Sequence, residues 1–340
     1  MNYIDFRSDT ATRPSPEMRK FMCEAEVGDD VLGEDPSINS LQEYAAALLG
    51  KEAAIFATSG TQSNLLALLS HLGRGDEYIV GQDAHTYKLE GGGAAVFGSI
   101  QPQPIEYEED GSLDLVKVKA KIKPDNIHYA CTRLLCLENT QDGKVLSLDY
   151  QAKAAAFAKD NGLAIHLDGA RIFNAAVKQN VDVKEISQHY DTVSVCLSKG
   201  LGAPVGSVLC GPKEIIKRAL RWRKVLGGGL RQGGIVAAGG LYALKNNIPR
   251  LAEDHANAAF LAEGLKEISE IQVMPRSGET NMVFIRILKK NSPDLITFLA
   301  ARGILLLPGR EPIRLVTHLD LKRSDMQSLI DGIKEFFAIR

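Results

Sequence analysis

Short apolar runs alternate with longer amphipathic stretches along most of this 340-residue chain, and this alternation limits the possible folds more than any other feature. Seven of the runs are interpreted as strands, at residues 53–57, 77–80, 100–106, 134–138, 164–167, 192–197 and 207–210. Most are continuously apolar, as is typical of strands that helices cover on both faces. Strands that alternate with helices predict an α/β fold, here with a mostly parallel, seven-stranded sheet.

Helices are predicted from the residues at their ends. Ser15 before Pro16 is typical of a helix start, and Asp35 before Pro36 begins a second helix that Gly50 ends. Further helices are expected at residues 62–72, 150–160, 250–268, 293–301 and 322–337. Lysines alternate with apolar residues over 117–123, which indicates a solvated helix face.

The lengths of the predicted helices and strands change after about residue 249. Shorter strands are expected beyond it, at 282–287, 304–307 and 314–316, and no low-complexity linker precedes them. We therefore predict a large domain over residues 1–249, with an N-terminal arm, and a smaller C-terminal α+β domain over 250–340.

Composition narrows the class of protein. Forty Lys and Arg against 42 Asp and Glu leave no overall field for nucleic acid or membrane, so any bound anion needs a local site. An odd count of five cysteines and an acidic start predict a cytoplasmic protein. Neither HExxH nor a Cys/His cluster occurs, so no catalytic metal is expected. The acidic loop containing Asp29, Asp30, Glu34 and Asp35 could bind a cation, but we interpret it as solvated.

The segment 58–64 joins a predicted strand to a predicted helix. Ser59, Gly60 and Thr61 would present hydroxyls and backbone N–H groups at the helix N-terminus, which is typical of a phosphate site. The alternative is an ordinary Ser/Thr cap. Neither GxGxxG nor a Walker A motif occurs, which disfavours a nicotinamide enzyme.

Two charged residues end later strands. Asp168 lies at the carboxyl end of one strand, and its alternative role is a simple pair with Arg171. Lys199 ends the next strand before Gly200, where apolar walls would favour a neutral amine; the alternative is a solvated lysine. Together with the phosphate loop they match pyridoxal 5'-phosphate, which needs a phosphate cradle, a carboxylate for its ring nitrogen and an amine for its aldehyde.

Seven motifs carry a resemblance that covers nearly the whole chain. They are RSDTATRP (7–14), GDDV (28–31), SGTQSN (59–64), LENT (137–140), DGAR (168–171), LSKGLGAPVG (197–206) and RWRK…GGGLRQ (221–232). With them the chain resembles the low-specificity L-threonine aldolases of the aspartate-aminotransferase superfamily. The resemblance implies fold type I, pyridoxal phosphate as a Schiff base on Lys199, and a homo-oligomer, dimer or tetramer. Leu32 stands where relatives usually have Tyr, which leaves the side-chain preference of the substrate pocket open.

The resemblance also implies roles for individual residues. His85 would stack on the cofactor ring and reach the substrate hydroxyl, as would His128, whose alternative is a surface loop. The substrate carboxylate would be bound by Ser8, Arg171 and Arg314. The neighbouring subunit would contact the phosphate through Lys224 and Arg231, whose alternative is a basic helix face. No role is assigned to the remaining histidines: His71, His166, His189, His255 and His318.

The resemblance implies an aldehyde-lyase that splits L-threonine or L-allo-threonine into glycine and acetaldehyde, with a place in glycine biosynthesis. A β-eliminating amino acid lyase would share Lys199 and Asp168 but break a bond from Cβ to a leaving group. A non-catalytic cofactor-binding protein would be expected to lack Lys199, Asp168 or an arginine clamp, and all are present.

Overall fold

The computed structural model describes residues 3–289 and 292–338 and contains a seven-stranded sheet. The strands are β2 (Ala53–Ala57), β3 (Asp76–Gly81), β4 (Gln101–Ile105), β5 (Cys131–Glu138), β6 (Ala164–Asp168), β7 (Thr192–Cys196) and β8 (Ser207–Gly211). Their order is β2-β8-β7-β6-β5-β3-β4, and every pairing is parallel except the two that β8 makes. This confirms the predicted α/β class and the mostly parallel sheet of seven strands.

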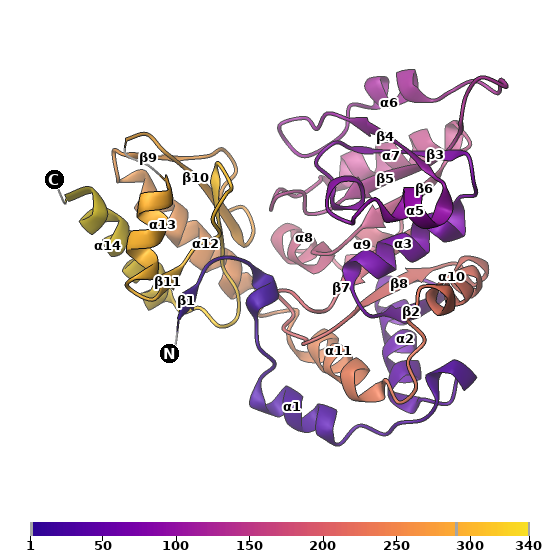
Figure 1. Cartoon of the computed structure of the whole chain (residues 1–340), viewed down its shortest axis with the longest axis horizontal. Coiled ribbons are helices and arrows are strands. Elements are labelled where there is room, and N and C mark those ends of the chain that lie inside the picture. The colour runs from indigo at the N-terminus through magenta and orange to yellow at the C-terminus, as the bar shows by residue number, and fades with distance from the viewer. Residues whose placement is uncertain (1–2, 290–291, 339–340) are drawn as a thin grey trace.

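Helices pack on both faces of this sheet (Figure 1). The longer ones are α1 (Pro16–Cys23), α2 (Pro36–Leu49), α3 (Gly60–His71), α7 (Leu148–Asp160), α8 (Ile172–Gln179), α10 (Lys213–Val225) and α11 (Gly234–Asn246). The shorter ones are α4 (His85–Lys88), α5 (Gly93–Gly98), α6 (Leu115–Lys121) and α9 (Val183–Ser187). Alternate residues of β5 enter different cores: Leu135 and Leu137 pack with α2, α7 and α8, whereas Leu134 and Cys136 pack with α3. Burial on both faces explains the continuously apolar runs.

The C-terminal part forms a smaller unit at one side of the large sheet (Figure 1). It contains α12 (Leu251–Lys266), β9 (Ile271–Val273), β10 (Met282–Ile287), α13 (Ser292–Ala300), β11 (Ile304–Leu305), β12 (Ile313–Val316) and α14 (Arg323–Ala338). Strands β12-β10-β9 are antiparallel and share a core of their own with the helices. A smaller C-terminal domain is therefore confirmed, while its boundary at residue 249 stays a prediction.

The N-terminal arm crosses to this smaller unit. Strand β1 (Ile4–Asp5) pairs in parallel with β11, and Phe6 is fully buried in the small core. A short 3-10 helix, η1 (Asp9–Ala11), then leads back to the large domain. Neither β1 nor β9 was predicted, because two or three residues are too short to show a strand period.

Two charged segments that were predicted to be solvated contain buried or paired side chains. Helix α6 ends at Lys121, and Lys123 beyond it pairs with the fully buried carboxylate of Glu77, Nζ to Oε2 being 2.7 Å. The helix-face interpretation is therefore wrong for Lys123. The solvated interpretation of the acidic loop is wrong for Asp30, which is buried against Arg223 (2.7 Å), and for Asp35, which accepts three backbone N–H bonds. Glu34 is exposed, as predicted. Buried carboxylates must find donors within the protein.

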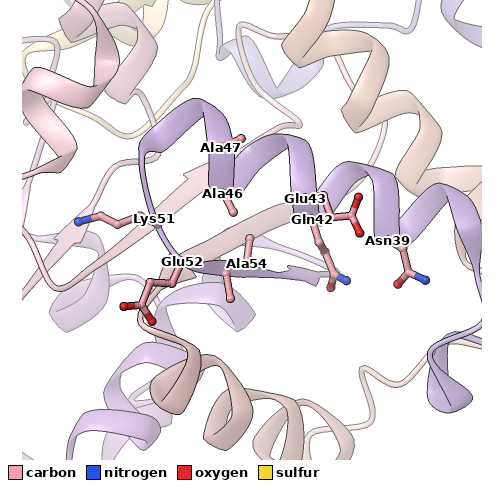
Figure 2. Close-up of a pocket in the computed structure, with 9 residues that line it drawn as sticks. Asn39, Gln42, Glu43, Ala46, Ala47, Lys51, Glu52 and Ala54 are labelled. Carbon is pink, nitrogen blue, oxygen red and sulfur yellow. The ribbon is translucent and has the colours of Figure 1, made fainter.

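Strand β2, at one edge of the large sheet, has a pocket of about 410 Å³ beside it, which α2 and the start of β2 line (Figure 2). Gln42 of this lining accepts the backbone N–H of Phe56 at 2.9 Å, so part of the sheet edge is already satisfied. The pocket contains none of the residues predicted to act in catalysis. Within residues 3–289 and 292–338, no helix is both long and apolar enough to cross a membrane.

Candidate active site

The carboxyl ends of four neighbouring strands bring the predicted site residues together. Lys199 follows β7, Asp168 ends β6, Glu138 ends β5, and α4 begins at His85 shortly after β3. These four strands are neighbours in the sheet, in the order β7-β6-β5-β3. Glu138 and Asp168 are register partners on adjacent strands. In open α/β sheets this edge is where ligands bind.

Lys199 is half-buried at this edge. Its backbone oxygen accepts a hydrogen bond from the Thr12 hydroxyl at 2.9 Å, which ties the segment to the N-terminal arm. Among the described residues its amine forms neither a hydrogen bond nor an ion pair, so it is not committed to a structural partner. This is the environment expected of an amine that binds a carbonyl group.

Asp168 is 2% exposed and is held by neutral donors. The side-chain amide of Asn64 donates to Oδ2 at 2.8 Å, and the backbone N–H of Ala170 donates to Oδ1 at 3.1 Å. The alternative pair with Arg171 is wrong, because that guanidinium binds another carboxylate. Asp168 therefore keeps its charge available for a ligand.

The partner of Arg171 is Asp9, in the N-terminal arm. Nε and one terminal nitrogen of the guanidinium donate to the two carboxylate oxygens at 2.7 and 2.6 Å, and Asn281 adds a third bond to Asp9. Burial would raise the pKa of Asp9, but Arg171 outweighs it and holds the pKa well below its usual range. No role was predicted for Asp9 from the sequence, although it lies beside Ser8 in the first motif.

Arg314, on β12, faces the same region from the small domain. It donates to the backbone oxygen of Arg7 at 3.1 Å, and its buried Nε has no partner. Burial lowers the pKa of Arg314, and the nearby charge of Arg171 lowers it further. Ser8 follows Arg7 in the chain, and its hydroxyl accepts a hydrogen bond from the N–H of Thr10 at 3.2 Å. Two neighbouring guanidiniums with an unsatisfied N–H form a site suited to a carboxylate.

His85 is anchored at both its backbone and its ring. Its N–H donates to Oε2 of Glu138 at 2.9 Å, and its Nδ1 lies 2.7 Å from Oε1 of Glu90. The hydrogen bond with Glu90 raises the pKa of His85. Burial raises the pKa of Glu138, and the adjacent charge of Asp168 adds to this effect. Neither carboxylate was singled out from the sequence.

The predicted phosphate loop is the N-terminus of α3. Ser59 caps the helix by accepting the N–H of Gln62 at 3.1 Å, so the ordinary cap interpretation holds for that hydroxyl. The free N–H groups of the first turn, beginning at Gly60, remain suited to an anion. Ser207 lies beside them, with a buried hydroxyl that has no partner.

The basic segment after α10 approaches the same helix. Its glycine turn packs on Gln62, since a Cβ added at Gly228 would lie 2.4 Å from that side chain. Lys224 is exposed, and Arg231 pairs with Asp29 at 2.8 Å. In the described part of the chain, neither cation makes a hydrogen bond or an ion pair with Ser59, Gly60 or Thr61.

His128 does not join the site within one chain. It is exposed in the loop before β5, whereas Glu138 ends that strand. Strands rise about 3.3 Å per residue, so the length of β5 alone, roughly 23 Å, separates the two edges. Within a single chain, the surface-loop alternative therefore describes its position.

The site residues fit pyridoxal phosphate. Donors without partners remain at Ser207 Oγ, Arg314 Nε and the buried Nδ2 of Asn139, which follows Glu138. Such buried donors are costly unless a ligand satisfies them. His85, Glu90 and Asp168 could also ligate a cation, since one ligand atom of each lies within 4.8 Å of the others. Those atoms, however, are already in short hydrogen bonds: His85 binds Glu90 directly, and Asn64 joins Glu90 to Asp168.

Comparisons with known proteins show the family of the chain. The family profile described as "Beta-eliminating lyase" matches residues 5–288. The "Low specificity L-threonine aldolase" of Escherichia coli K12 is 56% identical, over 98% of this chain and 99% of that protein. The "Low-specificity L-threonine aldolase 1" of Arabidopsis thaliana is 44% identical over 96% and 94%, and a Saccharomyces cerevisiae relative is 36% identical over 98% and 86%.

Solved structures extend the agreement to the fold. The threonine aldolase of Leishmania major superposes with a TM-score of 0.83 at 20% identity, covering 98% of this chain and 99% of that one. Sphingomonas wittichii serine palmitoyltransferase superposes at 0.76 with 16% identity, covering 98% and 86%. These confirm the expected fold type I. With its motifs, site and full-length identity to named relatives, the chain belongs to the low-specificity L-threonine aldolases of the beta-eliminating lyase family.

Proposed function

We propose that the chain cleaves L-threonine and L-allo-threonine to glycine and acetaldehyde, using pyridoxal 5'-phosphate attached to Lys199. The observation that carries this proposal is the convergence at one sheet edge of an uncommitted amine, the buried carboxylate of Asp168 and the α3 N-terminus. The names of the relatives support the same reaction.

The cofactor supplies, when bound, an electron sink for the negative charge that develops on the substrate α-carbon. Lys199 would bind its aldehyde, and Asp168 would pair with its ring nitrogen. Ser59, Gly60 and Thr61 would hold its phosphate at the positive end of the α3 dipole. His85, which follows β3 at the same edge, would pack against the ring.

The arginine pair decides which substrate bond breaks. Arg171, fixed by Asp9, and Arg314, with its unsatisfied Nε, would hold the substrate carboxylate together with Ser8. Holding the carboxylate orients the Cα–Cβ bond for cleavage, which is the positioning effect that dominates reactions of bound substrates. Misorientation would expose the Cα–H bond instead and favour racemisation or transamination.

His85 is the base that we propose for the β-hydroxyl proton. Glu90 holds its Nδ1, leaving Nε2 to accept a proton from the substrate. Because pairing with Glu90 raises the pKa of His85, the ring binds that proton more firmly than an isolated imidazole would. We propose that His128 assists from a neighbouring copy, since its loop also exposes Ile127 (96%) and Tyr129 (52%).

The phosphate also requires a cation that the α3 loop does not provide. We propose that the partner subunit supplies it through Lys224 and Arg231, in a dimer or tetramer. Cofactor binding and assembly are then linked, so that dilution to monomers releases the cofactor. Cofactor titration of Arg231→Ala, beside sedimentation of the wild type across protein concentrations, tests this; a fully loaded, active monomer would contradict it.

Product analysis tests the reaction itself. Incubation of the purified holoenzyme with each threonine diastereomer should release acetaldehyde and glycine in equal amounts. The family profile favours β-elimination as the second candidate, and that reaction would release ammonia and 2-oxobutanoate instead. Rates on the two diastereomers also measure the stereochemical preference.

The cellular setting follows from the same proposal. A glycine-forming reaction gives the enzyme a role in glycine biosynthesis. Unpaired thiols at all five cysteines agree with the reducing cytoplasm. Fractionation of cells, with the activity measured in each fraction, tests the location.

A further inference from the structure

One buried side chain joins the two carboxylates of the site. Asn64, the fifth residue of α3, is 2% exposed, and its amide nitrogen lies 2.8 Å from Oδ2 of Asp168 and 2.8 Å from Oε1 of Glu90. A carboxamide nitrogen carries two hydrogens, and here each has a separate acceptor. Both N–H groups of Asn64 therefore have acceptors, one on Asp168 at the end of β6 and one on Glu90 after α4.

The oxygen of this amide contacts a histidine on its other side. Nε2 of His166 lies 3.3 Å from Oδ1 of Asn64, and because that oxygen only accepts, the imidazole must donate there. Its Nδ1 then accepts from the hydroxyl of Thr192 at 2.8 Å, and that hydroxyl accepts from Nε2 of His71 at 2.9 Å. Burial lowers the pKa of His166 to about 3 and that of His71 to about 4, so both rings stay neutral.

The chain of bonds therefore permits one arrangement of hydrogens. A flipped amide would turn its oxygen toward the carboxylate oxygens of Asp168 and Glu90, which have no hydrogen to donate. This would place acceptors together in a buried, low-dielectric region. Three residues to which no role was assigned thus act on the site through Asn64.

We propose that Asn64 is a positioning residue that holds Asp168 toward the cofactor ring and couples it to the Glu90–His85 pair. The proposal rests on the proposed function for the role of the ring. It deepens that function by adding a residue that touches neither substrate nor reacting atoms.

A neutral donor suits this position better than a cation. A lysine or arginine at residue 64 would pair with Asp168 and reduce the negative charge that is left for the ring nitrogen. An amide satisfies one oxygen and leaves the net charge intact. By serving Glu90 with its second hydrogen, Asn64 also stabilises the carboxylate that holds His85.

Two variants with opposite electrostatic effects test the proposal. Asn64→Leu keeps the shape and removes both donors, whereas Asn64→Asp keeps the size and replaces the donors with a further acid. The matched control is Asn174→Leu, because Asn174 is a buried asparagine paired with a histidine, His255, at 3.1 Å outside the site. Circular dichroism checks the fold of all three, and Asn64→Asp remains informative where Leu is not tolerated.

The first measurement is the dissociation constant of pyridoxal phosphate. Hydrogen bonds to charged groups contribute enough that losing one weakens binding about 10-fold or more. Asn64→Leu should show this loss, with a similar fall in kcat and a KM for threonine that changes less than about threefold. Asn174→Leu should stay within about twofold of the wild type in each.

The second measurement is the pKa of His85 in the cofactor-free protein, from histidine ring NMR signals assigned with His85→Gln. The charged groups around this ring are Glu90, Asp168 and Lys199, with Glu138 at its backbone. Removing the donor in Asn64→Leu disfavours ionised Glu90, so the pKa of His85 should fall. The added acid in Asn64→Asp should raise it. A merely structural role would not give shifts of opposite sign.

The outcomes separate this inference from the proposed function. A wild type that neither binds the cofactor nor cleaves threonine refutes the function, while the His85 titration still reports the coupling. A wild type that is active, beside folded Asn64 variants with unchanged cofactor affinity, kcat and His85 pKa, refutes the role of Asn64 alone.

Discussion

Two buried carboxylates, one near the amino ends and one at the carboxyl ends of the strands of the large sheet, are satisfied in different ways. Glu77, near the amino end of β3, is 0% exposed and receives both Lys123 contacts at 2.7 Å, with Thr132 and Gln101 at 2.9 Å. Asp168, at the carboxyl end of β6, receives two neutral N–H donors and no ion pair among the described residues. Burying a charge without a counter-charge is costly.

The comparison separates a structural carboxylate from a functional one. The protein compensates Glu77 completely with its own cation, so this charge is available to nothing else. Asp168 and Glu138 have no ion-pair partner among the described residues, and a cationic ligand group would compensate them. Strong burial alone therefore does not identify a catalytic acid; the missing cation does.

The largest effect should come from the amine beside the under-compensated carboxylate. Lys199→Ala should abolish turnover, because the variant lacks the amine that lies near Asp168 and has no hydrogen-bond or ion-pair partner among the described residues. Borohydride reduction of the wild type, followed by peptide mapping, should find the cofactor on the Lys199 peptide. A label on Lys224 or any other lysine would end the assignment.

Asp168→Asn should retain the fold and lower kcat by about 100-fold or more. The amide cannot keep the ring nitrogen protonated, and each 1.36 kcal/mol of lost stabilisation is a factor of ten. Steady-state kinetics, with the melting temperature of the cofactor-free protein as control, measure this. A near wild-type rate would mean that Asp168 has only a structural role.

Lys123→Met should show the reverse pattern. Removing the cation leaves Glu77 buried without a partner, and breaking a buried pair typically costs about 3–5 kcal/mol. Urea denaturation should therefore show a large loss of unfolding free energy, while kcat and KM of the folded fraction stay within about twofold. A matched fall in kcat would show that the two edges of the sheet are not independent.

Much of the fold could be predicted because its signal is local. The large-sheet strands were predicted from continuous apolar runs, and the starts of α1 and α2 from their Ser15 and Asp35 caps. Strands β1 and β9 could not be predicted, since two or three residues are too short to show a strand period, and β1 pairs with β11 far along the chain. The predicted solvation of Lys123 is wrong for the same reason, because its partner lies 46 residues away.

The residues of the site also divide into those with a local sequence signal and those without one. Lys199, Asp168 and Gly60 could be identified because each ends a strand or begins a helix. Their supporting partners could not be, since Asp9 lies 162 residues from Arg171 and Asn64 lies 104 residues from Asp168. Only the fold brings these together. His166, a polar residue within the apolar run 164–167, carries a local signal, whereas Asn64 follows the polar run 58–63 and carries none.

The smallest effect compares Glu138 with Glu77. Because burial raises the pKa of Glu138 above 4.5, its ordinary value, the folded protein keeps a proton there that the unfolded chain loses. Stability therefore falls as pH rises from the unfolded pKa toward the folded one. Glu138→Gln removes this penalty, so the cofactor-free variant should match the wild type near pH 4 and be more stable near pH 8, by a difference that grows as the pH rises between them. Glu77→Gln should instead lose stability at pH 8, since it discards a compensated charge. Urea denaturation at both pH values measures the two differences, and a Glu138→Gln variant that is less stable at pH 8 would show that this carboxylate is as fully compensated as Glu77.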